Sequence, residues 1–344
     1  MVLDLQAAPT GPEDVRTGGS VPGTVKQASG GVARNVAASL ATLCSEELRP
    51  LLISLVGCDA AGATLLRHWA ELGLSSRGLL QSDTASTPTV STIFDRGGEV
   101  AASIADCESL EIELTPAALQ RHQADIAAAP LLVLDANLAV NTIEAASRMA
   151  SEVGVPIWFE PVSVPKSRRA TSVLRLLHYI SPNAMELVAM ANAVRQAAGS
   201  SELPWRLPDE GSTAAVIVHS LAPHLQAVLQ AGAQAVMLTL GRFGAAVCRL
   251  DKASRSIVVA HMSALPAQVV NLSGAGDCLV AGAVAALLQG KTDAQALAHG
   301  MALAKCAVES EENVPRPIDL HTVQVAADHM LASLTKWHLP VPSL

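Results

Sequence analysis

The chain has 344 residues, a formal net charge of −8 and no run of lysine or arginine, which argues against nucleic-acid binding through a basic face. Six cysteines lie far apart without a Cys-x-x-Cys pair, a pattern that favours reduced, mostly buried thiols in a cytoplasmic protein over a zinc site. No N-terminal apolar run resembles a signal peptide, and no apolar run is long enough to span a bilayer, so a membrane protein is not expected.

In chain order, short apolar runs alternate with helical patterns. The apolar runs predict strands near residues 1–5, 51–56, 131–134, 155–159, 178–180 and 235–240. The helical patterns lie near residues 32–43, 60–72, 140–153, 222–230, 278–288, 294–310 and 320–334. Residues 245–250 and 256–259 are candidates for two antiparallel strands. This alternation predicts an α/β fold whose parallel sheet is wound by right-handed crossovers.

One segment departs from the alternation. Residues 89–94 alternate between apolar and polar side chains, residues 96–99 are typical of a turn, and residues 100–104 extend again. We interpret this as a β-hairpin that forms a small flap outside the main sheet. The glycine-rich residues 17–29 are candidates for further strands of the flap.

The stretch Asn271–Asp277, NLSGAGD, places two glycines directly before an apolar helix. Backbone N–H groups at such a helix start form an anion hole suited to phosphate. Asp277, in the first helical turn, could take a proton from a substrate hydroxyl held beside that hole. A tight turn with an ordinary acidic cap explains the stretch equally well, so the stretch alone leaves both interpretations open.

Polar residues also stand at the ends of the predicted strands, where ligands bind in parallel sheets. They are Asp4, Asp135, Asn137, Glu160, Asn183, Thr239 and Asp277. A single residue of this kind is more often a helix cap than a ligand. Seven of them, together with the glycine-rich helix starts at Gly30-Gly31 and Gly274–Gly276, favour a binding site.

Several motifs, in order along nearly the whole chain, resemble those of the ribokinase-like (PfkB) carbohydrate and nucleoside kinases. They are Gly30-Gly31 with Asn35, Val56–Gly62, Ser181–Glu186, Thr239–Gly244 and Asn271–Asp277. The resemblance implies a single kinase domain over residues 1–344, with three α/β/α layers and a mainly parallel central sheet. It also implies a small β-sheet lid, formed by about residues 12–30 and 85–113, which would close over the substrate.

In the family, a complete strand precedes the position of Asp4, whereas here only three residues do. We therefore expect a truncated first strand, and a protein that is less stable or less active than one in which that strand is restored. The strand would lie inside the sheet, so its loss would expose backbone groups and apolar surface of its neighbours.

The resemblance also implies roles for individual residues. Asp277 would be the general base on a sugar 5′-hydroxyl, and the N–H groups of Gly274, Ala275 and Gly276 would form the anion hole. The implied substrate-binding residues are Asp4, Gly30, Gly31, Asn35, Asp135, Asn137 and Lys166. The implied ATP-site residues are Asn183, Thr239, Gly241, Ser273, Gly274 and Gly276. Asn183, and Glu186 through water, would organise Mg²⁺.

Simpler interpretations stand beside these roles. Asn183 and Asp135 are also typical helix caps, and Glu186 is also typical of a solvated helix face. Thr239 also suits a plain strand position, and Lys166 also suits surface charge.

Within the family, residues 134–138 and 160–166 resemble the pseudouridine kinase branch most, and Asn271, where most relatives have Asp, agrees. The resemblance thus implies ATP-dependent conversion of pseudouridine to pseudouridine 5′-phosphate. The alternatives are a kinase for another ribonucleoside or a ribose-type sugar, and a truncated, non-catalytic ligand-binding form. Asn271 removes a carboxylate near the family's monovalent-cation site, so K⁺ stays an open candidate beside ATP and Mg²⁺. An exposed lid edge would allow a homodimer.

Overall fold

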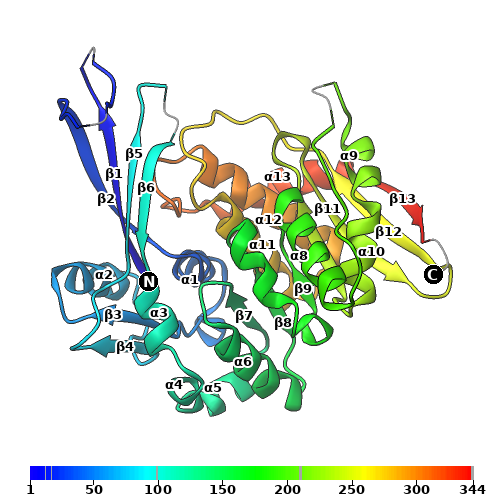
Figure 1. Ribbon diagram of the computed structural model, residues 1–344, viewed down its shortest axis with the longest axis horizontal. Helices are drawn as coiled ribbons and strands as arrows, with labels where there is room; N and C mark the ends of the chain where they lie inside the picture. The colour runs from blue at the N-terminus through cyan, green and yellow to red at the C-terminus, as the bar shows by residue number, and fades with distance from the viewer. Residues whose placement is uncertain (12, 17, 98–99, 209–210, 342–344) are drawn as a thin grey trace.

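The computed structural model describes residues 1–11, 13–16, 18–97, 100–208 and 211–341. Its strands form three sheets, of seven, four and two strands. Figure 1 shows the four-stranded sheet at one side of the molecule, with the N-terminus at its base, and the seven-stranded sheet among helices beside it.

The seven-stranded sheet has the order β13-β12-β11-β10-β9-β8-β7. Its parallel strands are β7 (Leu132–Asp135), β8 (Ile157–Glu160), β9 (Tyr179–Ile180) and β10 (Ala235–Thr239). Its antiparallel strands are β11 (Ala245–Asp251), β12 (Ser256–Met262) and β13 (Thr335–Pro340). The parallel half carries five of the polar residues that the sequence places at strand ends, namely Asp135, Asn137, Glu160, Asn183 and Thr239. The other two lie elsewhere: Asp4 is inside the strand Val2–Pro9 of the four-stranded sheet, and Asp277 is in the helix Ala275–Leu288.

Helices cover both faces of this sheet, and each face has its own apolar core. One core is formed with α6 (Val140–Glu152), α8 (Ala184–Ala197), α9 (Ala214–Ser220) and α10 (Ala222–Gln230). The other is formed with α1 (Val32–Leu43), α11 (Ala275–Leu288), α12 (Asp293–Val308) and α13 (Leu320–Ala332). In β8, Ile157 and Phe159 belong to the first core and Trp158 to the second, because successive strand side chains point to opposite faces. Burial on both faces explains the continuous apolar runs.

The four-stranded sheet has the order β2-β1-β5-β6. Its members are β1 (Val2–Pro9), β2 (Gly23–Gly30), β5 (Thr89–Phe94) and β6 (Val100–Asp106). Strand β1 pairs antiparallel with β2 and parallel with β5, and β5 pairs antiparallel with β6. The predicted hairpin is thus present, although part of its turn lies outside the described residues. The lid expected over 85–113 also takes in Glu108–Glu113, which forms the helix α3 and is no part of this sheet.

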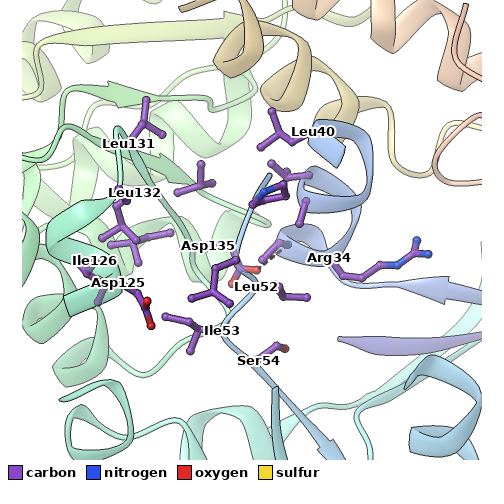
Figure 2. A pocket seen from close by; sticks show the side chains of 18 of the residues that line it. Arg34, Leu40, Leu52, Ile53, Ser54, Asp125, Ile126, Leu131, Leu132 and Asp135 are labelled. Atoms are coloured by element: carbon purple, nitrogen blue, oxygen red, sulfur yellow. Dashed lines mark hydrogen bonds between the residues drawn. The ribbon is translucent and has the colours of Figure 1, made fainter. Parts of the chain in front are cut away.

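The two-stranded sheet pairs β3 (Ser54–Gly57) with β4 (Leu79–Ser82). The sequence predicts this first strand from residue 51, but residues 51–53 have no strand partner. They line a cavity of about 390 Å³ between β3 and β7, in which Figure 2 shows Leu52 and Ile53 across from Leu131 and Leu132. Within the described part of the chain, no strand pairs with the second edge of β3 or of β7. A missing first strand would leave unpaired edges of this kind, but the expected truncation itself stays a prediction.

Shorter elements complete the fold. They are α2 (Ala60–Glu71), α4 (Pro116–Gln120), α5 (Gln123–Ala128), α7 (Val164–Ser167) and single 3-10 turns at Glu46–Leu48, Arg168–Ala170, Leu174–Leu176 and Gly241–Phe243. The sequence predicts a helical end to the chain, but β13 follows α13 instead. Strand β13 forms because it pairs antiparallel with the outer edge of β12 and buries Leu339 against the core.

Two expectations about composition can be compared with the structure. Within the described residues no helix combines the length and apolarity needed to cross a membrane. All six cysteines are free thiols, as predicted, but they are less buried than expected. Only Cys248 and Cys278 are fully buried, and Cys58 is exposed.

Candidate active site

The glycine-rich turn before α11, where the sequence predicts an anion hole, begins the helix with a left-handed glycine. Gly274 caps the helix with a φ of 79°, and a Cβ there would lie 2.1 Å from the carbonyl oxygen of Asn313. Only glycine satisfies both the left-handed backbone and this close approach. The N–H groups of a first helical turn have no partner within the helix and so favour an anion, although the N–H of Ala275 also donates to the carbonyl oxygen of Leu272 at 3.5 Å.

Asp277 stands in the first turn of α11, beside these N–H groups. Its Oδ2 accepts a hydrogen bond from Nδ2 of Asn35 in α1 at 2.7 Å. Burial raises the pKa of Asp277 to about 7, the carboxylates of Asp135 and Asp4 raise it as well, and the Asn35 hydrogen bond opposes them. A carboxyl group with a pKa near neutrality is suited to accept a proton from a hydroxyl group.

Asp4, Gly30 and Asn35 gather on the lid side of Asp277. Asp4 Oδ2 accepts a hydrogen bond from Nδ2 of the buried Asn313 at 3.2 Å, and burial raises the pKa of Asp4 to about 6. A Cβ on Gly30 would lie 2.0 Å from that same oxygen, so the strand end accommodates Asp4 only because residue 30 is glycine. Gly31, with a φ of 95°, then begins α1 and brings Asn35 to the site.

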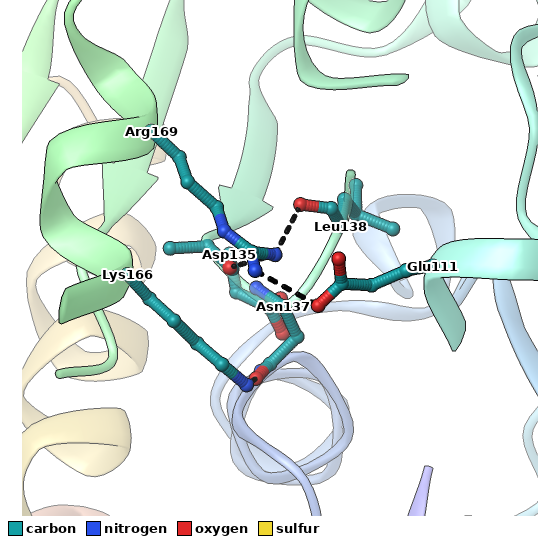
Figure 3. A network of polar contacts seen from close by, with 7 residues as sticks. Glu111, Asp135, Asn137, Leu138, Lys166 and Arg169 are labelled. Carbon is teal, nitrogen blue, oxygen red and sulfur yellow. Dashed lines mark hydrogen bonds and ion pairs between the residues drawn. The ribbon is translucent and has the colours of Figure 1, made fainter. Parts of the chain in front are cut away.

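Asp135, Asn137 and Lys166 form a chain of polar contacts at the end of β7 (Figure 3). Asp135 accepts from the backbone N–H of Ala33 at 3.2 Å and from that of Asn137 at 2.9 Å. Asn137 Oδ1 accepts from Nζ of Lys166 at 2.7 Å. Lys166, which the sequence also allowed as plain surface charge, therefore lies beside the predicted substrate residues.

Arg169 secures the loop that carries Asn137. Its guanidinium group donates to the carbonyl oxygens of Ala136 at 3.3 Å and of Leu138 at 2.9 Å, and to Oε1 of Glu111 at 2.8 Å (Figure 3). The loop is thus held from both sides of Asn137.

A cavity of about 210 Å³ lies on the other side of Asp277. Its lining residues are Val32, Glu160, Val162, Ser181, Asn183, Glu186, Thr239, Gly276, Asp277 and Leu279. Asn183 and Glu186 form a capping box at the start of α8, with each side chain bound to the backbone N–H of the other residue at 2.9 Å. The cap interpretation of Asn183 is therefore correct, whereas Glu186 is buried and the solvated-face interpretation of that residue is wrong. Both residues line the cavity as well. Thr239 lies at the end of β10 and bridges to Asn183.

Three predicted ATP-site residues, Gly241, Ser273 and Gly274, lie outside the lining of this cavity. Gly241 begins the 3-10 turn after β10 with a φ of 56°. Ser273 is exposed, and its backbone N–H donates to Oδ1 of Asn271 at 2.9 Å, which closes the glycine-rich turn on itself.

The structure adds residues that the sequence left without a role. Glu160 is buried at the end of β8 beside Ser181, which donates a hydrogen bond to its carboxyl group and accepts one from Trp158 Nε1 at 2.8 Å. Burial raises the pKa of Glu160 well above its usual range, and the negative charges of Asp277 and Glu186 add to the effect. The strand-end position of Glu160 was its signal in the sequence.

Arg34 and Asn313 are also new to the site, and neither had a signal in the sequence beyond its neighbours. Asn313 connects Asp4 to the backbone of Gly274 from a segment far along the chain. Arg34 is buried beside Asn35 and donates to the side chain of that residue at 3.1 Å.

Comparison with known proteins shows the family to which the chain belongs. The family model described as pfkB family carbohydrate kinase matches residues 1–317. A pseudouridine kinase from Arabidopsis thaliana is 36% identical, covering 95% of this chain and 94% of its own length. A pseudouridine kinase from Escherichia coli is 25% identical, covering 87% of this chain and 86% of its own length.

Comparison of the fold with solved structures finds ribokinases. The structure of Arabidopsis thaliana ribokinase complexed with ribose and ATP superposes with a TM-score of 0.68 at 18% identity, covering 95% of each chain. The predicted α/β ribokinase-like class, with a mainly parallel main sheet and small separate sheets, is thus confirmed. The family match spans most of the chain, including the glycine-rich turn and Asp277, and the chain therefore belongs to the pfkB family of carbohydrate kinases.

Proposed function

We propose that the protein phosphorylates the 5′-hydroxyl of pseudouridine with ATP, yielding pseudouridine 5′-phosphate and ADP. The observation that carries the proposal is the position of Asp277. It lies between the Asp4 and Asn35 group on one side and the cavity with Asn183 and Glu186 on the other, at the mouth of the anion hole.

In this proposal the two groups of residues bind the two substrates. Asp4, with Gly30 and Gly31 at its side, would hold the ribose hydroxyls, because a buried carboxylate accepts hydrogen bonds from vicinal hydroxyl groups. Asn137 and Lys166 would face the nucleobase, since an amide and an ammonium group together match the carbonyl and N–H edge of a uracil ring.

Thr239 and Asn183, with Gly241 and Ser273 further out, would receive ATP, and Gly274–Gly276 would receive its transferred phosphate. The oxygen-rich lining near Asn183 and Glu186 fits Mg²⁺, an ion that keeps several waters and binds through one or two protein carboxylates plus phosphate.

The chemical step follows from the position of Asp277. The substrate 5′-oxygen forms a bond to the γ-phosphorus while the bond from that phosphorus to the β–γ bridging oxygen breaks, and ADP leaves. Asp277 takes the hydroxyl proton, and the N–H groups of the glycine-rich turn stabilise the negative charge on the transferred group. Positioning and charge stabilisation are the main demands of phosphoryl transfer.

A substrate panel tests the proposal. The purified protein is assayed with ATP and Mg²⁺, with and without K⁺, on pseudouridine, uridine, adenosine and ribose. We expect the highest kcat/KM on pseudouridine and loss of transfer in Asp277→Asn. A higher kcat/KM on another member of the panel would assign that substrate instead. Transfer that persists in Asp277→Asn would contradict the role of Asp277 as base.

A non-catalytic ligand-binding protein is the second candidate, which the interrupted sheet between β3 and β7 favours. It predicts saturable binding of pseudouridine by calorimetry without phosphate transfer to any member of the panel.

A further inference from the structure

Arg34 is a buried cation with no part in the proposed reaction. Its side chain comes from α1 and is only 6% exposed. Arg34 is among the residues that line the cavity between β3 and β7, and Figure 2 shows its guanidinium group directed away from the middle of that cavity. Burying a guanidinium group is costly unless its N–H groups are used, which raises the question of what this one does.

The hydrogen bonds of Arg34 use one end of its guanidinium group, whereas its buried Nε has no hydrogen-bond partner among the described residues. One nitrogen, Nη1, donates to the carbonyl oxygen of Ser29 at 3.1 Å and to Oδ1 of Asn35 at 3.1 Å. Ser29 belongs to the end of β2 in the four-stranded sheet, and Asn35 donates to Asp277 at 2.7 Å. A continuous chain of hydrogen bonds therefore runs from the end of that strand, through Arg34 and Asn35, to the carboxyl group of Asp277.

The chemistry of arginine gives this chain a direction. A guanidinium group has only donors, so the atom of Asn35 that faces it must be the amide oxygen. The NH₂ group of Asn35 must then face Asp277, where it stabilises the ionised carboxylate. Without Arg34 the amide could rotate and present its oxygen to Asp277, which would favour the protonated acid instead.

We propose that Arg34 is a positioning residue for the base, because it holds the Asn35 amide with its NH₂ group toward Asp277 and links that orientation to the end of β2. The inference rests on the proposed function, because it assigns Asp277 as the base. The other groups that act on Asp277 are the carboxylates of Asp4 from β1, Asp135 from β7 and Glu160 from β8. The charged groups around Arg34 itself are Arg316, Glu312 and Asp4. Arg34 reaches Asp277 by hydrogen bonds through Asn35 and also acts by charge on Asp4, so removing Asn35 isolates the part of its effect that passes through the amide.

The test is the pH dependence of kcat in Arg34→Met, Arg34→Lys, Asn35→Ala and the double variant Arg34→Met/Asn35→Ala. We expect the acid limb of Arg34→Met to move up by about one pH unit, equivalent to a roughly tenfold loss of kcat below the midpoint. Arg34→Lys keeps a donor and a charge, so it should shift less. The part of the Arg34→Met shift that passes through the amide should vanish in the Asn35→Ala background.

Ser39 provides a matched control on the same helix. It is fully buried and contacts Cys278 of α11 through its hydroxyl group, but it lies outside the hydrogen-bond chain. Ser39→Ala should change the melting temperature and leave the pH midpoint where it is. If Arg34→Met lowers the melting temperature but leaves the midpoint unchanged, Arg34 is only structural and the inference fails. If it shifts the midpoint equally with and without Asn35, the inference fails as well.

A second readout does not need turnover. The pKa of Asp277 can be followed by NMR in protein with ¹³C-labelled aspartate carboxyl groups, with Asp277→Asn to assign the signal. We expect a higher pKa in Arg34→Met than in the wild type, and Arg34→Lys serves if Arg34→Met does not fold. An unchanged pKa would overturn the inference. A raised pKa in a protein without kinase activity would support it while contradicting the proposed function.

Discussion

The two sides of the proposed site are built on differently completed sheets. The side toward Asn183 and Thr239 rests on β8, β9 and β10, each paired on both edges and buried on both faces. The side toward Asp4 and Asp135 rests on β1 and β7, next to the cavity that separates the unpaired edges of β3 and β7. Asp277 stands between the two sides, held by Asn35.

This difference separates two tasks. Phosphate transfer needs groups fixed to a fraction of an ångström, and a fully paired sheet with two apolar cores supplies that rigidity. The substrate side is connected to the rest of the molecule by individual hydrogen bonds, such as Asn313 to Asp4 and Ala33 to Asp135. We therefore expect changes on the first side to act on kcat, and changes on the second side to act on stability and KM.

The largest effect is expected from Asp277→Asn. The amide keeps the size of the side chain but cannot accept a proton, so kcat should fall by about 10²–10⁴-fold while KM changes little. Steady-state kinetics on the preferred member of the substrate panel measure this. A loss confined to KM would place Asp277 in binding and would break the proposed division between the two sides.

A strand supplied to the gap should stabilise the protein. Six apolar, β-branched residues fused ahead of Met1 could pair with β3 and β7 and fill the cavity of about 390 Å³. We expect a gain on the order of 2–4 kcal/mol in the free energy of unfolding, measured by urea titration.

The matched control for the fused strand carries proline at its second and fourth positions. Proline cannot donate to a β-ladder, so this control should gain little. Equal free energies of unfolding for the fused and the unfused chain would show that the gap does not accept a strand.

The pH dependence of stability should reveal the raised pKa of the Asp277 carboxyl group at the centre of the site. The pKa of Asp277 is about 7 in the folded protein, whereas an unfolded aspartate titrates near its ordinary value. Between those values the folded state binds the extra proton, so this group loses stabilising effect as pH rises through about 7. The melting temperature of Asp277→Asn should therefore gain on that of the wild type as pH rises toward 7, and level off above it.

Taking the difference between variant and wild type removes the other titrating groups. One of them is the buried Met1 ammonium group, whose lowered pKa of about 6 acts in the opposite direction. A difference in melting temperature that does not change with pH would mean that the Asp277 pKa is ordinary.

The smallest effect is expected at the free edge of the four-stranded sheet. Strand β6 is exposed along its length, with Ile104 at 75% exposure, and such an edge can pair with a second copy of the chain. If the protein is a dimer through this edge, Ile104→Asp should shift sedimentation toward the monomer with little change in stability. Val153→Asp, at an exposed apolar position after α6, is the control. A dimer that survives Ile104→Asp would place the interface elsewhere.

Much of the fold could be predicted from local sequence. Continuous apolar runs predicted β8 and β10, because both faces of those strands are buried. The alternation of apolar and polar residues predicted the β5–β6 hairpin, because strand side chains repeat every two residues and helix side chains do not. β13 was missed because its place depends on an open edge of β12, which is a tertiary property. The strand predicted from residue 51 was too long because its first residues lack a partner.

For the site, the sequence by itself predicts the positions at which only one or two residue types suit the backbone or the charge. Gly274 adopts a left-handed backbone and Asp277 follows it in the first helical turn, so local order predicts this turn and its carboxyl group, although not their role. Only the tertiary structure decided which distant groups meet there. The hydrogen bond from Asn35 to Asp277, the contact of Asn313 with Asp4 and the burial of Glu160 all join segments far apart in the chain. Burial and hydrogen bonding, which set the pKa of Asp277, exist only once those segments are packed together.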